Sequence, residues 1–183
     1  MLKAKKGRLL ISEPSLNDNV FFKSVVLLTH HNDDESIGLI LNHPTKINLN
    51  EILNDIPLSD LPIYIGGPVE KQSLHFIHTL GSIIPNSKQI IDGIYFGGDF
   101  ETVIQLMHDK KITKNEIRFF VGDSGWEAEQ LNNEIRDDAW IVQTAKNELC
   151  MNYSTPKLWS DIIKTKKMKH AIWANMPKDP SLN

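Results

Sequence analysis

Cysteine is almost absent from this sequence, and its absence excludes two common ways of holding a small fold together. Cys150 is the only cysteine among the 183 residues, so an intramolecular disulfide and a zinc site built from several thiolates are both excluded. Cys150 has no basic or glycine-rich flanks, which favours a buried, inert thiol over a redox sensor. A chain of this length can fold around its own hydrophobic core without either device.

Long apolar runs and an excess of positive charge are also missing. No stretch approaches the ~20 apolar residues that cross a bilayer, and the apolar run at residues 9–11 is too short for a signal peptide. The net charge is −3 and the pI is about 6.1, whereas a nucleic-acid-binding domain usually carries a strongly basic face. We therefore predict a cytoplasmic protein with no membrane segment, for which nucleic acid is not the expected partner.

What is present is a globular composition in which strand signals outnumber helix signals. Apolar and β-branched runs predict strands at residues 7–12, 20–30, 37–42, 63–65, 74–80, 94–96, 117–121 and 139–142. Only an acidic loop separates the second run from the third, which predicts a hairpin. We predict one compact α+β domain over residues 1–183, with a largely antiparallel, strongly curved sheet, a few flanking helices, and flexible ends at 1–6 and 178–183.

Capping signals mark the predicted helices. Asn48 and Glu51 form a variant capping box for a short helix that ends near Asp55. Asp99 is placed to cap a helix at residues 100–108. A third helix is expected at residues 127–136, and the two tryptophans that bracket it should pack its apolar face on the sheet.

A last helix is predicted to open at Thr155-Pro156, with proline at its first position. Its end, residues 164–169, is rich in lysine, and Trp159 and Trp173 lie nearby. Such a cluster could be a weak nucleic-acid or partner surface. A solvated helix end is the favoured interpretation, because lysine suits the negative pole of the helix dipole.

The most distinctive string is Gly122-Asp123-Ser124-Gly125, which follows a strand and precedes a helix. A Gly-Asp-Ser-Gly string surrounds the nucleophile of chymotrypsin-like proteases, which also need a histidine base, here His30, His31 or His43. The favoured interpretation is a turn at which Asp123 and Ser124 accept hydrogen bonds from the first amides of the helix.

The remaining histidines and glycines do not form a recognisable site. His75 and His78 lie three apart in a predicted strand, so they should face opposite sides and not share a metal ion. Glycine corners at residues 66–67, 97–98 and 122–125 could cradle an anion, but none matches a phosphate-binding motif, and turn geometry is favoured. We expect no metal and no cofactor. His43 could titrate near neutral pH, although a structural role is favoured.

Several ordered motifs resemble one known family. They are Gly7-Arg-Leu-Leu-Ile11, Phe22-Lys-Ser-Val-Val-Leu-Leu28, Gly38-Leu-Ile-Leu-Asn-His-Pro44, Tyr64-Ile-Gly-Gly-Pro-Val69 and Gly125-Trp-Glu-Ala-Glu-Gln-Leu131. Together they are similar to the YqgE/AlgH family of bacterial proteins, over about residues 7–140. The resemblance implies a bifurcated sheet bent into a pseudo-barrel. The AlgH name comes from a genetic link to alginate regulation, and the family's description as a transcriptional regulator follows from that link. The resemblance implies no defined reaction.

The resemblance also suggests a shared pocket. Residues that match the family pattern, with His43 added from the residue chemistry, form the candidate set: Ser24, Asn42, His43, Pro44, Gly66, Gly67, Pro68, Gly125, Trp126 and Gln130. The chain departs from the usual Gly-Tyr-Ala-Gly-Trp corner at Asp123 and Ser124, which therefore cannot carry a family-wide reaction. It departs also at Glu129, where the family has a smaller residue, and at Lys23, where it has arginine.

Three functions remain open on these residues. The first is a regulatory or adaptor protein that acts through a small ligand or a protein partner. The second is an enzyme of unknown chemistry, with a pocket near Asn42-His43 and the Gly66-Gly67 and Gly125-Trp126 corners. The third, a nucleic-acid binder, predicts a contiguous face of lysine and arginine. We favour the first.

Overall fold

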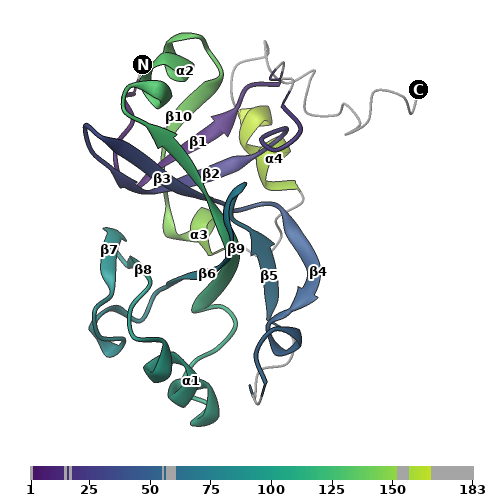
Figure 1. The fold of residues 1–183 in the computed structure, drawn as a ribbon, viewed down its shortest axis with the longest axis vertical. Helices are drawn as coiled ribbons and strands as arrows, with labels where there is room; N and C mark the ends of the chain where they lie inside the picture. The colour runs from purple at the N-terminus through teal and green to yellow at the C-terminus, as the bar shows by residue number, and fades with distance from the viewer. Residues whose placement is uncertain are drawn as a thin grey trace.

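The computed structural model describes residues 2–14, 16, 18–54, 56, 61–151 and 157–165. Within these ranges ten strands form one connected sheet (Figure 1). The strands are β1 (Arg8–Ser12), β2 (Val25–His31), β3 (Glu35–Ile40), β4 (Pro44–Asn48), β5 (Pro62–Ile65), β6 (Val69–His78), β7 (Lys88–Ile91), β8 (Ile94–Phe96), β9 (Ile117–Glu127) and β10 (Trp140–Thr144). The helices are α1 (Phe100–His108), α2 (Gln130–Arg136), α3 (Asn147–Cys150) and α4 (Leu158–Thr165), with 3₁₀ turns at Leu49–Glu51 and Gly81–Ile83.

The sheet is organised around β9, which crosses the middle of the molecule in Figure 1. The main strand order is β10-β1-β2-β3-β9-β6-β8-β7, and β4 and β5 branch from it beside β9. The first half of β9 pairs with β5 in parallel and with β6 in antiparallel, and its second half pairs with β3. The sheet therefore divides along one strand. The predicted α+β fold with a largely antiparallel, curved sheet is confirmed.

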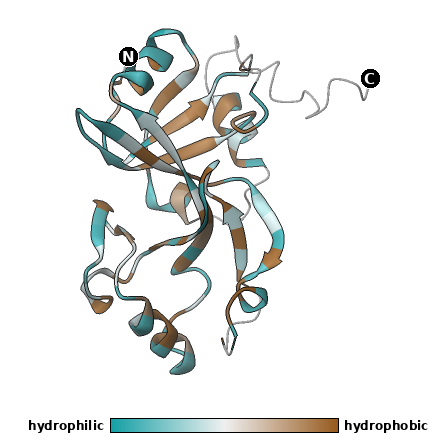
Figure 2. Ribbon diagram, in the orientation of Figure 1, coloured by the Kyte–Doolittle hydropathy of each residue, from teal (hydrophilic) through white to brown (hydrophobic). Residues whose placement is uncertain are grey.

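The upper part of the sheet, which we define as β10, β1, β2 and β3, has a buried core on each face. Figure 2 shows how hydrophobic β1 and β2 are. Leu9 and Ile11 point to one face, where they meet Trp159 and its neighbours on α4. Leu10 points to the other face, where it meets the tryptophans around α2. Burying one such side chain contributes roughly 1.5–3 kcal/mol. The continuous apolar runs in the sequence reflect this burial on both faces.

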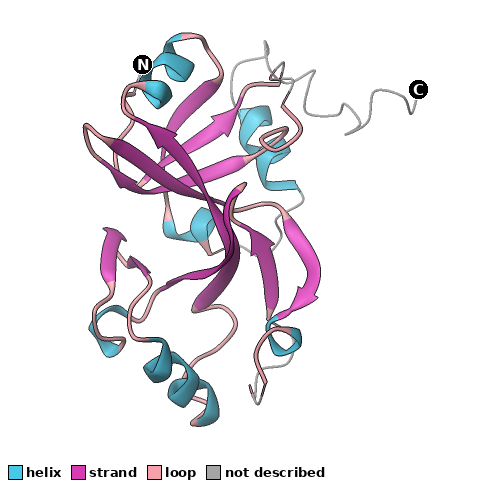
Figure 3. Cartoon of the chain, in the orientation of Figure 1, coloured by secondary structure: helices cyan, strands magenta, loops and turns pink. Residues whose placement is uncertain are grey.

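A third core lies in the lower part of the sheet, which we define as β5, β6 and the first half of β9, and it packs against α1. Val103 and Met107 on α1 are buried against Phe76 and Phe119. The helix bounds and the cap are as predicted, because the Asp99 carboxylate accepts a hydrogen bond from the amide of Thr102 at 2.8 Å. Figure 3 shows that the helices lie around the edges and flanks of the sheet.

Two other local predictions have mixed outcomes. The β2–β3 hairpin is confirmed, although β2 begins at Val25 and not at residue 20 as predicted. The capping box at Asn48 is confirmed as well, since the Asn48 backbone N–H donates to Glu51 Oε1 at 2.8 Å. The box caps a single 3₁₀ turn and not a longer helix. The predicted end of that helix at Asp55 lies outside the described residues.

The prediction of a turn at residues 122–125 is wrong. Strand β9 continues through Gly122-Asp123-Ser124-Gly125, because Asp123 pairs with Val69 and Ser124 pairs with Gly38. Asp123 and Ser124 do not cap the next helix, which begins later than expected, at Gln130 after Glu129. Cross-strand pairing outweighed the local turn signal of a glycine-framed polar string.

Three strand predictions need correction, and two of the strands concerned, β4 and β7, lie at sheet edges. Strands β4 and β7 were not predicted, and β6 begins at Val69 where a strand was expected only from residue 74. These segments are largely exposed and rich in polar residues, so their sequences lack the apolar alternation of a half-buried strand. The predicted helix start at Thr155-Pro156, the lysines beyond Thr165 and the tail at 178–183 lie outside the described residues. None of the helices in the described ranges is long and apolar enough to span a membrane.

Candidate functional site

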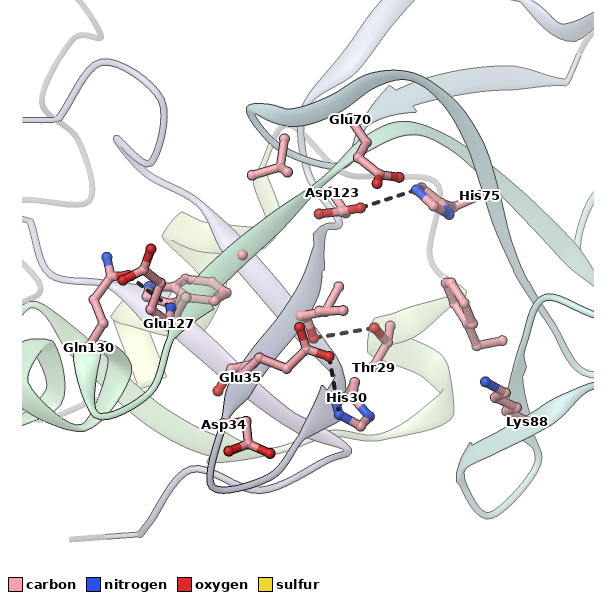
Figure 4. Close-up of a pocket in the computed structure, with 16 residues that line it drawn as sticks. Thr29, His30, Asp34, Glu35, Glu70, His75, Lys88, Asp123, Glu127 and Gln130 are labelled. Carbon is pink, nitrogen blue, oxygen red and sulfur yellow. Dashed lines mark hydrogen bonds and ion pairs between the residues drawn. The ribbon is translucent and has the colours of Figure 1, made fainter.

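An open cleft of about 890 Å³ lies where the sheet divides (Figure 4). One wall comes from the end of β2 and the start of β3, and the opposite wall comes from β6, β7 and β8. The second half of β9 forms the floor between them, with Asp123, Gly125 and Trp126. The cleft is thus a direct product of the change of partners along β9.

Negative charge dominates the cleft. Its carboxylates outnumber its basic side chains, and they come from the β2–β3 turn, β6 and β9: Asp34, Glu35, Glu70, Asp123 and Glu127. The basic groups are His30, His75 and Lys88, and the His30 imidazole lies 3.7 Å from the Glu35 carboxylate. A concave wall lined with one sign of charge concentrates ligands of the opposite sign. The cleft therefore suits a cation.

Three of these side chains converge at the inner end of the cleft. His75 Nε2 lies 3.3 Å from Asp123 Oδ2, and the two side chains are only 20% and 12% exposed. Glu70 completes the group, because one donor atom from each residue lies within 4.8 Å of the other two. Burial raises the pKa of Asp123, and the charge of His75 partly opposes that rise.

Sequence reasoning missed this group. His75 and His78 diverge as predicted, since His78 is fully buried and its Nε2 lies 3.0 Å from the Gly97 carbonyl oxygen. His75 instead meets carboxylates from a neighbouring strand and from the start of its own strand. A continuous β9 paired with β6 would have brought Asp123 beside His75. Because a turn was predicted at residues 122–125, the pairing of β9 with β6 that places Asp123 close to His75 was not predicted.

A carboxylate clamp fixes α2 against the floor of the cleft. Glu134 Oε2 accepts one hydrogen bond from the Trp126 indole at 2.9 Å and another from the Trp140 indole at 2.7 Å. Gln130 donates to Glu134 Oε1 at 2.9 Å. The two tryptophans pack with Leu131, as predicted.

The predicted pocket residues fall into two places. Gly125, Trp126 and Gln130 line the cleft. Asn42 and His43 lie at the other end of β3, beside the start of β2. There the Asn42 side chain accepts from the Val25 amide at 2.8 Å and donates to the Lys23 carbonyl at 2.8 Å.

Ser24 belongs to the second place, where its Oγ lies 3.3 Å from His43 Nε2. Pro44 begins β4, and Pro68 immediately precedes β6. The structure does not gather the whole predicted set around one cavity, and the proposal of a pocket shared by all ten residues stays a prediction.

Gly66 and Gly67 have a packing role against β9. A Cβ atom on Gly66 would lie 2.1 Å from the Gly122 carbonyl oxygen, and one on Gly67 would lie 2.1 Å from the Asp123 carbonyl oxygen. Side chains cannot be accommodated at that approach of two backbones. These glycines therefore allow β9 to pass close to the segment between β5 and β6.

The Gly-Asp-Ser-Gly string does not form a protease site. Ser124 is fully buried, and its hydroxyl donates to the Gly66 carbonyl oxygen at 3.0 Å. Its backbone lies in the middle of a paired strand. A nucleophile must reach a substrate carbonyl, and this hydroxyl is directed into the protein.

Comparison with solved structures defines the class of fold. The chain superimposes on the crystal structure of protein DIP2367 from Corynebacterium diphtheriae with a TM-score of 0.75, at 21% identity, over 96% of this chain and 94% of that one. It superimposes on the solution structure of the AlgH protein from Pseudomonas aeruginosa with a TM-score of 0.74, at 21% identity, over 98% and 100% of the two chains. The fold is that of these divided-sheet α+β proteins.

Sequence comparison then gives the family. Residues 9–171 match the model of the AlgH-like family, DUF179. The UPF0301 protein BF2109 of Bacteroides fragilis is 38% identical over 97% of this chain and 91% of its own length. A UPF0301 protein of Chlorobaculum parvum is 36% identical over 100% and 97% of the two chains. The chain belongs to the AlgH-like family.

Proposed function

We propose that this is a cytoplasmic regulatory protein that binds a small cationic ligand in the cleft beside β9 and reports its presence to a protein partner. The observation that supports the proposal is the gathering of five carboxylates around one cavity of about 890 Å³. Phe96 adds aromatic surface to the same lining, and aromatic rings attract cations. A polyamine or another small amine has the matching chemistry.

The same charge argues against a role in direct DNA binding. Nucleic-acid binding draws most of its affinity from lysine and arginine contacts to phosphates. The walls of this cleft carry the opposite charge, and the chain as a whole has a net charge of −3. A regulatory role would therefore run through a ligand and a protein partner.

A titration with spermidine tests the proposal. Glu35 and Glu127 are exposed carboxylates on the cleft wall and floor, so a Glu35→Gln/Glu127→Gln variant should weaken binding about fivefold while the fold is retained. Glu101→Gln on α1 is the matched control, because it makes the same chemical change away from the cleft. Isothermal titration calorimetry at low salt measures all three proteins. Equal affinity in all three, or no binding to the unmodified protein, would refute the proposal.

One contact favours an enzyme as the second candidate. Ser24 Oγ and His43 Nε2 lie 3.3 Å apart, which is the pairing of a nucleophile with a base. Ser24 is fully buried, however, so a substrate would need an opening beside β2. Labelling with a fluorophosphonate distinguishes the readings: an enzyme predicts labelling that Ser24→Ala abolishes, and a structural pair predicts none.

A further inference from the structure

We propose that Glu70, His75 and Asp123 bind a divalent transition-metal ion at the inner end of the cleft. The inference deepens the proposed function, because it rests on the acidic cleft and names the class of cation held at its floor. The donor atoms of the three residues already lie within 4.8 Å of one another. Figure 4 shows Glu70 and Asp123 directed toward the His75 ring from two strands.

The register of β6 creates this convergence. Val69 pairs with Asp123 and Leu74 pairs with Val121, and the register shifts between these two pairs. The bulged segment turns Glu70 and His75 toward the same point on β9. The Ser73 hydroxyl donates to Glu70 Oε2 at 3.1 Å, and the His75 ring stacks on Phe96 with centroids 5.8 Å apart. Glu70 and His75 are thus each oriented by a neighbour, and such supporting contacts are typical of metal sites.

An independent observation concerns the ring nitrogen of His75. Nε2 is fully buried and makes no hydrogen bond with any residue that the structure describes. Its polar contact is the ion pair with Asp123 Oδ2 at 3.3 Å. A buried polar atom normally has a partner. A metal ion held between Nε2 and the Asp123 carboxylate would replace this single contact with two metal–ligand bonds, since a neutral imidazole nitrogen is a common metal ligand.

The ligand set selects the kind of metal. Mg²⁺ and Ca²⁺ prefer shells made entirely of oxygen, whereas one imidazole with two carboxylates suits Zn²⁺, Mn²⁺ or Co²⁺. Donor atoms bound to one ion at about 2.1 Å lie no more than about 4.2 Å apart. Rotation of Glu70, which is exposed, closes the remaining gap. The cleft side of the ion would stay open to water or to a further ligand.

Titration of the untagged protein with ZnCl₂ and CoCl₂ tests the site, with MgCl₂ for comparison. We expect one Zn²⁺ per chain, and a visible Co²⁺ absorption spectrum from a site of low coordination number. His75→Gln and Asp123→Asn should each weaken Zn²⁺ binding at least tenfold. His108→Gln is the matched control, because it removes an exposed histidine at the end of α1, outside both the cleft and the group. It should stay within twofold of the unmodified protein.

Two results would overturn the metal site. One is no Zn²⁺ binding by the unmodified protein at millimolar concentration. The other is an equal loss in His75→Gln, Asp123→Asn and His108→Gln, which would show that Zn²⁺ binding does not depend on the three-residue group. Circular dichroism without metal checks that each variant is folded. Spermidine titration of the same proteins separates the two proposals: spermidine binding without Zn²⁺ binding rejects the metal site alone, and the loss of both rejects the cationic cleft as well.

Discussion

The first half of β9, from Ile117 to Val121, is enclosed by strands on both sides, whereas its second half, from Gly122 to Glu127, forms the floor of an open acidic cleft. In the first half Ile117, Phe119 and Phe120 are fully buried, and in the second Gly125 and Glu127 reach solvent. One continuous strand thus anchors the core and presents the site. Substitutions in the first half should cost stability, and substitutions in the second should cost ligand binding.

The largest expected effect is at Arg118, in the first half. Its guanidinium is fully buried, donates to the carbonyl oxygens of Leu41 and Cys150 at 2.6 Å each, and lies over the Tyr64 ring at 4.2 Å. Arg118→Met leaves those carbonyls without this donor and should lower the free energy of unfolding by about 4 kcal/mol. Urea denaturation measures the loss. A change below about 1 kcal/mol would contradict a stabilising role for the first half.

A somewhat smaller effect is expected at Gly67, where the strand changes partners. Gly67→Ala places a Cβ atom 2.1 Å from the Asp123 carbonyl oxygen, so the backbones must separate, at a cost of about 2–3 kcal/mol. Gly125→Ala is the control, because its Cβ atom would meet only Val69 Cγ2, at 3.6 Å. It should change stability by less than about 0.5 kcal/mol. Equal losses of stability in Gly67→Ala and Gly125→Ala would show that the close approach of Gly67 to β9 does not cause the loss.

The next prediction concerns pH and His78, which pairs with Ile117 at the start of β9. Burial lowers the pKa of His78, and the Gly97 carbonyl partly opposes that shift. Its Nδ1 accepts from the Leu80 amide, so the neutral ring fits the site. His78 therefore takes up a proton at a higher pH in the unfolded chain than in the folded protein. Stability from this group is therefore present above the unfolded pKa of about 6.5 and is lost as pH falls below it.

Thermal unfolding between pH 7.5 and pH 5 checks the His78 prediction. The melting temperature of the unmodified protein should fall with pH more steeply than that of His78→Gln, which cannot take up a proton. Parallel curves for the unmodified protein and His78→Gln would reject the assignment to His78.

The smallest effect on stability is expected in the second half. Glu35 and Glu127 face each other as a pair in the β3–β9 register and are exposed. Removing both charges should change the free energy of unfolding by no more than about 0.5 kcal/mol, because surface substitutions rarely do more. Urea denaturation of the Glu35→Gln/Glu127→Gln variant measures this. A loss near that of Arg118→Met would remove the distinction between the halves.

Sequence patterns predicted the parts of the fold that local chemistry determines. The apolar runs of β1 and β2 and the cap at Asp99 needed no knowledge of distant residues. Strand β4 could not be predicted in the same way, because an edge strand with polar residues carries no apolar alternation. The string at Gly122 looked like a turn because its strand character comes only from pairing with distant strands.

The candidate site shows the same limit more sharply. Trp126 and Gln130 could be placed at a pocket through the family motif, which keeps them close in the sequence. The group of Glu70, His75 and Asp123 could not, because it depends on a register shift in β6 and on the pairing of β6 with β9. The residue types alone suggested possible metal ligands. Only the pairing of the strands showed that the three side chains lie close together.

The position of β1 has a consequence for synthesis on the ribosome. Strand β1 lies between β2 and β10, and its Arg8 pairs with Thr144, 136 positions later. The β2–β3 hairpin can form early, but the outer edges of β1 and β3 stay open until β10 and β9 have emerged. Open strand edges favour pairing with other chains. The nascent protein therefore carries two unpaired edges until β9 and then β10 have emerged, late in its translation.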